Sequence, residues 1–76
     1  MSSWEYLKLT AEHTSSGYTT WSVEPETGEA PARNTPAMEV LNELGEQGWE
    51  LVSQRRWDSH PGWVTVAEYL LKRELP

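Results

Sequence analysis

The spacing of apolar residues changes from a helical period to a strand period near the middle of the chain. Leu41 and Leu44 recur at helical spacing, and Gly48 stands where a left-handed C-terminal cap needs a residue without a Cβ atom. From Trp49 onward the period is two, as in a strand. The pattern therefore predicts a helix that stops at Gly48, with Trp49 packed back against Leu44.

The start of this helix is predicted at Thr35 and Pro36. Threonine is a common N-cap, and proline suits the first helical position because it has no backbone N–H to leave unpaired. The apolar residues that follow define the stripe expected to face the core: Ala37, Met38, Leu41 and Leu44.

Two strands are predicted before the helix. The first runs from Trp4 to about Ala11, and the second covers Tyr18 to Val23, which is rich in residues that favour strands. Placing Leu9 opposite Trp21 gives the pair one apolar face. Residues 24–34 have no period and contain two prolines and a glycine, so we expect a mobile loop there.

The last two strands are predicted to form a hairpin around residues 58–62. Placing Trp57 opposite Trp63 aligns Leu51 with Tyr69 on the face that should carry the helix. The chain is thus expected to form one α+β domain, residues 1–76. Its fold would be a four-stranded antiparallel sheet with one helix on one face, in the order β-β-α-β-β.

The other face of this sheet is also apolar. One helix cannot cover both faces, and an antiparallel sheet with a wet face should alternate apolar and polar residues. We therefore expect a homo-oligomer, with a dimer as first choice. Two alternatives stay open: the 24–34 segment covers this face, or another protein does. The expected interface residues are Trp4, Tyr6, Val52, Val64, Val66 and Leu70.

Charge and composition narrow the range of partners. Twelve acidic and six basic residues give a net charge of −6, which opposes attraction to phosphate backbones, so no nucleic-acid partner is expected. The apolar runs are too short for a membrane span. The start at Met1 does not resemble a signal peptide, and cysteine is absent, so we expect a cytoplasmic protein.

Residues for catalysis are few. His13 and His60 are the only histidines, both in predicted hairpin loops, and neither a phosphate-binding glycine loop nor a metal-ligand spacing is present. We expect a non-enzymatic interaction module without cofactor or metal. An alternative is a protein that binds or sequesters a small, nucleotide-like anion at one end of the last hairpin. The residues gathered there are Arg55, Arg56, Trp57, His60 and Trp63. A cross-strand Trp57–Trp63 pair would explain the same cluster structurally.

Three segments carry a resemblance to a known family. They are Trp4-Glu5-Tyr6, the stretch from Leu44 to Ser53 with its Gly-Trp-Glu-Leu-Val motif, and Tyr69-Leu70-Leu71-Lys72-Arg73. Together they resemble domain-of-unknown-function family 4177, a group of very small bacterial and phage proteins. The resemblance implies a fold with a single helix and implies no activity. This chain differs in placing Leu7 before Lys8 and in carrying an insert from about Glu12 to Arg33.

Overall fold

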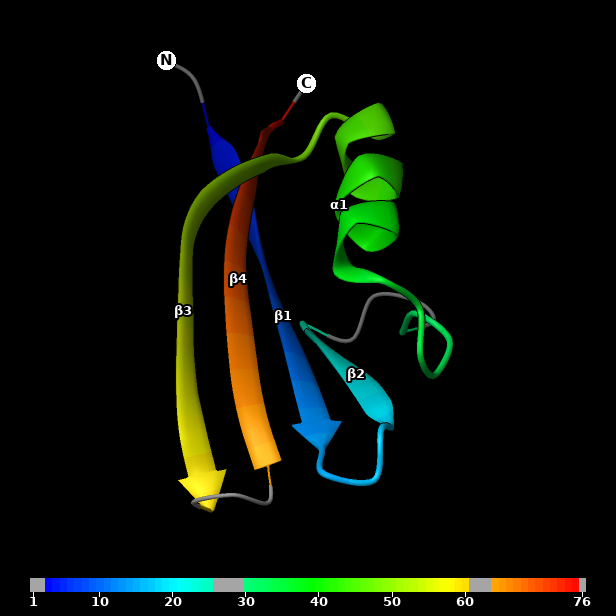
Figure 1. Ribbon diagram of the computed structural model, residues 1–76. Helices are drawn as coiled ribbons and strands as arrows, with labels where there is room; N and C mark the ends of the chain where they lie inside the picture. Colours follow the sequence, from blue (N-terminus) through cyan, green and yellow to red (C-terminus); the bar gives the residue numbers. More distant parts are fainter. Residues whose placement is uncertain (1–2, 26–29, 61–63, 76) are drawn as a thin grey trace.

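The fold consists of two hairpins joined side by side into one antiparallel sheet, with a helix on one face (Figure 1). The computed structural model describes residues 3–25, 30–60 and 64–75. Within them lie β1 (Trp4–Thr14), β2 (Thr19–Glu24), α1 (Ala37–Glu46), β3 (Glu50–His60) and β4 (Val64–Glu74). The strand order in the sheet is β2-β1-β4-β3. The predicted α+β class and β-β-α-β-β order are therefore confirmed.

The two hairpins are joined by the pairing of β1 with β4. These strands run antiparallel from Trp4 opposite Glu74 to Thr14 opposite Val64. This pairing carries both termini to the same end of the sheet (Figure 1). Strand β1 is longer than predicted, because β4 pairs with it beyond Ala11 as far as Thr14.

The hydrophobic core lies between the helix and one face of the sheet. Alternate residues of β1 and β4 point to this face, as the strand period requires. The Trp21 indole stacks on Tyr69 with ring centroids 6.1 Å apart, and its Nε1–H donates to the Thr35 carbonyl at 3.0 Å. This bond fixes the chain just before the helix. The buried core residues are Leu7, Leu9, Ala11, Trp21, Val40, Ala67, Tyr69 and Leu71.

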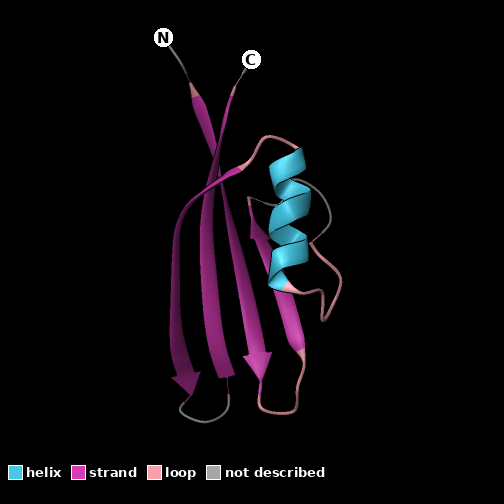
Figure 2. Ribbon diagram, turned by 45° about the horizontal axis from the view of Figure 1, so that its top comes forward, coloured by secondary structure: helices cyan, strands magenta, loops and turns pink. Residues whose placement is uncertain are grey.

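The helix covers only part of this face. It has 10 residues, or about 15 Å, whereas β1, β3 and β4 have 11 residues each and span about 37 Å. The helix stands over the β2 side, at the end of the sheet that holds the termini (Figure 2). The molecule is accordingly elongated, with extents of 46 × 20 × 20 Å.

Both predicted hairpin registers are wrong. Leu9 lies opposite Val23 rather than Trp21, a shift of two residues that leaves the same side chains on the core face. Trp57 lies opposite Val66 rather than Trp63, because the β3–β4 ladder continues to His60 and Val64. Trp63 itself lies outside the described residues.

In the β3–β4 hairpin, the wrong register also put Trp57 on the wrong face of the sheet. Irregularities in the β3–β4 ladder leave one extra residue in β3 between Leu51 and Ser53 and another between Asp58 and His60. An extra residue in one strand reverses the alternation beyond it. Leu51 therefore lies on the core side opposite Leu71, whereas Trp57 lies on the other face opposite Val66.

The helix begins one residue later than predicted and buries a different stripe. Pro36 is the N-cap, and the Thr35 hydroxyl donates back to the Ala32 carbonyl at 2.7 Å instead of capping the helix. Met38 is 67% exposed, while Val40 is buried in the core. Ala37, Leu41 and Leu44 pack against that core as predicted.

The predicted helix stop at Gly48 is confirmed. Gly48 has φ +93°, its N–H donates to the Gly45 carbonyl at 3.0 Å, and the Trp49 N–H donates to the Leu44 carbonyl at 3.0 Å. This pair of bonds is the Schellman motif, which satisfies carbonyls that the helix end would leave unpaired. Trp49 then packs against the core, and β3 begins at Glu50.

Candidate interaction surface

The sheet face opposite the helix, here called the open face, carries large aromatic side chains in solvent. Trp4 and Tyr6 of β1 are 40% and 55% exposed, and Trp57 of β3 is 37% exposed. Val66 of β4 lies opposite Glu12 of β1 on one side and opposite Trp57 of β3 on the other. Val66 is buried, although it does not belong to the core cluster. The open face therefore carries exposed aromatic side chains and one buried valine that are separate from the core.

Positive side chains lie over the aromatic rings of the open face. The Lys72 ammonium lies 4.3 Å from the centroid of the Trp4 ring, and the Arg55 guanidinium lies 4.6 Å from that of Trp57. Each contact is a cation–π interaction, worth about 0.5–1 kcal/mol at an exposed site. Both ends of the face thus combine an aromatic ring with a cation.

The middle of the open face carries a band of paired charges. Glu68 lies 3.7 Å from Arg55 and 4.0 Å from Lys8, and Lys8 also lies 3.1 Å from Glu24. Exposed pairs of this kind contribute little to stability. They do leave the centre of the face close to neutral, so a second surface of the same kind would meet no net repulsion there.

The expected interface residues are only partly brought together. Trp4, Tyr6, Val66 and Leu70 occupy alternate positions of β1 and β4 on the open face, as expected. Val64 lies in the last row, opposite Thr14. Val52 lies in the β3 irregularity and is 48% exposed. The alternating pattern of the sequence did not place Trp57 on the open face. The extra residue in β3 turns Trp57 to this face, and no sequence signal marks that residue.

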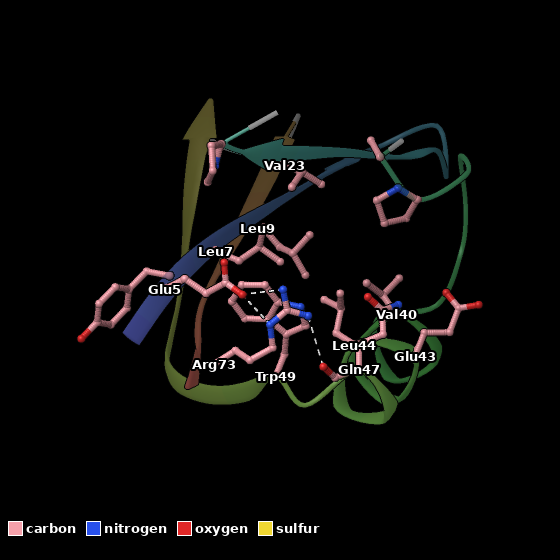
Figure 3. Close-up of a pocket in the computed structure, with 14 residues that line it drawn as sticks. Glu5, Leu7, Leu9, Val23, Val40, Glu43, Leu44, Gln47, Trp49 and Arg73 are labelled. Atoms are coloured by element: carbon pink, nitrogen blue, oxygen red, sulfur yellow. Dashed lines mark hydrogen bonds and ion pairs between the residues drawn. The ribbon is translucent and has the colours of Figure 1, made fainter. Parts of the chain in front are cut away.

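Part of the described 24–34 segment lies on the helix side of the sheet, whereas Glu24 at the end of β2 pairs with Lys8 on the open face. Pro25, Ala30 and Pro31 line a cleft of about 580 Å³ between α1 and the sheet (Figure 3). Residues 26–29 lie outside the described residues. Pro25, Ala30 and Pro31 therefore border the core face, and these three residues give no support to the alternative in which the segment covers the open face.

Arg73 is the main polar group of this cleft. Its guanidinium pairs with Glu5, donates to the Gln47 carbonyl at 3.2 Å, and lies 4.4 Å from the centroid of the Trp49 ring (Figure 3). It thus connects β4 with β1 and with the helix end. Sequence reasoning missed this role, because Glu5 and Arg73 are neighbours only in the folded register.

The described residues of the expected anion site are only partly brought together. Arg55 and Trp57 lie on the open face, whereas Arg56 lies on the core side, because successive side chains of a strand alternate. Arg56 and Trp57 still border one shallow hollow, together with His13, Asp58 and Thr65, and in this hollow Thr65 Oγ1 donates to Asp58 Oδ1 at 3.0 Å. The side chain of His60 and all of Trp63 lie outside the described residues.

Within the described residues, no group of three or more His, Asp or Glu side chains is placed to hold a metal ion. No helix in that part of the chain is long and apolar enough to cross a membrane.

Comparison with known proteins gave no relative. We found no significant match to a family model, to a curated protein or to a solved structure. Membership of family 4177 therefore stays a prediction from the three segments that resemble it.

Proposed function

We propose that this protein is a small interaction module that self-associates through its open face. One observation carries the proposal: Trp4, Tyr6 and Trp57 expose aromatic surface on the side of the sheet that the helix does not cover. Large aromatic side chains exposed on an uncovered sheet face favour an interaction site there.

The area of the open face is compatible with a dimer. Three strands of about 37 Å and the shorter β2, spaced about 4.8 Å apart, give roughly 600 Å² per copy. Two copies packed face to face would remove roughly 1,200 Å² from water, which is the lower end for a stable interface. We therefore propose a reversible dimer, in which the neutral charge band of one copy lies against that of the other.

The position of each residue decides which variant tests this proposal. Val66 is buried in the isolated chain, so a charge there would unfold the protein whether or not it dimerises. Tyr6 is 55% exposed and Leu70 is half-buried. A lysine at either position can therefore reach solvent in a monomer. Tyr6→Lys and Leu70→Lys should therefore weaken the dimer and leave the fold intact.

Met38→Lys is the matched control, because it adds the same charge at an exposed apolar residue of the helix. The measurement is the mass by light scattering over a series of concentrations, with circular dichroism to show that each variant is folded. We expect Tyr6→Lys and Leu70→Lys to have a lower mass than wild type and Met38→Lys at the same concentration, because these two variants lose the open-face contact. Equal masses for all four proteins would contradict the proposal.

The alternative function, binding of a nucleotide-like anion, keeps less support. Arg55 already contacts Glu68 and Trp57, and Arg56 lies on the other face beside Asp58, whose carboxylate repels an anion. A thermal-shift screen with nucleotides tests it, since a ligand that binds only the folded state raises the melting temperature.

A further inference from the structure

The outer edge of β3 is the long unpaired edge of this sheet. Within the described residues β3 pairs with β4 alone, and its side chains from Glu50 to Ser59 are all exposed. An edge strand has N–H and C=O groups without partners, which makes it a template for another strand.

At the opposite edge of the sheet, formed by β2, some of the outward backbone groups are hydrogen-bonded. There, the Asn34 N–H donates to the Thr19 carbonyl at 2.9 Å, and the Thr19 N–H donates to Asn34 Oδ1 at 2.8 Å. Asn34 thus satisfies backbone groups of the β2 edge. Nothing in the described residues does the same for β3.

The charges along β3 disfavour several ways of pairing two copies. In a two-fold antiparallel pair, one residue lies opposite its own copy, and residues equally distant from it on either side lie opposite each other. An axis at Arg55 or at Arg56 would oppose two arginines, and an axis at Asp58 would oppose two aspartates. Like charges directly opposite each other destabilise a sheet.

An axis at Trp57 gives the opposite result. Trp57 then meets Trp57 of the second copy, and Arg56 of each copy meets Asp58 of the other. The side chains of Arg56 and Asp58 share the core side of the sheet, so each arginine can reach its opposing carboxylate. The ion pairs that the structure gives for described residues do not include Arg56, so its charge is available.

We infer that a second copy of this chain pairs with the β3 edge, antiparallel and centred on Trp57. The two sheets would join into one continuous sheet with both helices on the same face. The triplet Arg56-Trp57-Asp58 makes this register self-complementary, and registers centred on Arg56 or Asp58 would oppose like charges. This surface is distinct from the centre of the open face, so the inference goes beyond the proposed function and does not depend on it.

A charge-reversal experiment tests the inference. Arg56→Asp puts two aspartates opposite each other at both contacts, and Asp58→Arg does the same with two arginines. Each single variant should raise the dissociation constant of the edge contact by at least about tenfold. The double variant Arg56→Asp/Asp58→Arg restores opposite charges, so its dissociation constant should return towards that of wild type.

Mixing the Arg56→Asp and Asp58→Arg proteins is the most specific test of the edge contact. In a mixed pair, both contacts join an aspartate with an arginine, so the two variants should form the edge contact with each other although neither forms it alone. The readout is mass by light scattering, with circular dichroism as the check on folding. The control is Leu70→Lys, which charges the centre of the open face and should leave the edge contact intact.

The results separate the two surfaces. Single variants that lose the edge contact and regain it by mixing, while Leu70→Lys keeps it, support the inference. Single variants whose association equals that of wild type at every concentration overturn the edge contact and leave the open-face proposal standing. Loss of association that neither mixing nor the double variant repairs would also overturn it.

Discussion

Replacing Gly48 by alanine tests the corner on which the fold depends. Gly48 has φ +93°, a conformation that costs a residue with a Cβ atom about 1–2 kcal/mol. The new Cβ would lie 3.4 Å from Arg73 Cδ, an ordinary contact with a flexible side chain, so space is not the obstacle. Backbone strain alone should then lower the free energy of unfolding by about 1–2 kcal/mol.

Gly45→Ala is the matched control. Gly45 lies inside the helix, and nothing lies within 4 Å of the Cβ that alanine would add. Alanine there should raise the stability by about 0.5–1 kcal/mol, because glycine is the weaker helix former. The same substitution three residues apart is therefore expected to have opposite signs.

Thermal unfolding followed by circular dichroism measures both variants. For a domain of this size, 1 kcal/mol shifts the melting temperature by about 4–8 °C, so the pair should be clearly separated. A Gly48→Ala protein that melts with wild type would refute the left-handed cap. A Gly45→Ala protein that melts earlier would refute the assignment of Gly45 to the helix.

Three further predictions follow from individual contacts. Val40→Ala should cost about 1–3 kcal/mol in urea unfolding, whereas Met38→Ala should stay within about 0.5 kcal/mol, and equal effects would refute the observed stripe. Arg73→Ala should cost about 1–2 kcal/mol, because it removes the contacts to Glu5, the Gln47 carbonyl and Trp49, discounted for their exposure. Nucleoside diphosphates should leave the melting temperature unchanged, and a dose-dependent rise would favour the anion-binding alternative.

The sequence-based predictions were most accurate for features that a few neighbouring residues determine. Gly48 followed by Trp49 marks a helix end, because the left-handed position needs glycine and the next apolar residue must pack back on the helix. The four strands and their order along the chain also followed from local periods. Val40 was missed although it lies three residues after Ala37 and four before Leu44, so the signal for the correct stripe was present.

Other features depended on long-range register and could not be read locally. The face of Trp57 depends on the extra residue near Val52, and no residue type marks that irregularity. The pairing of Glu5 with Arg73 depends on the alignment of β1 with β4. The candidate surface was therefore predicted in its β1 and β4 residues and missed in its β3 residue.

The most direct test of the open-face dimer is a dilution series of the isotope-labelled wild-type protein, followed by two-dimensional NMR. The account predicts that the signals of Trp4, Tyr6 and Leu70 shift with concentration, while those of the exposed helix residue Met38 do not. Dissociation would expose the first group to water and leave the helix unchanged. Signals that stay fixed up to high micromolar concentration, or that shift on the helix instead, would contradict the claim that the open face binds a second copy.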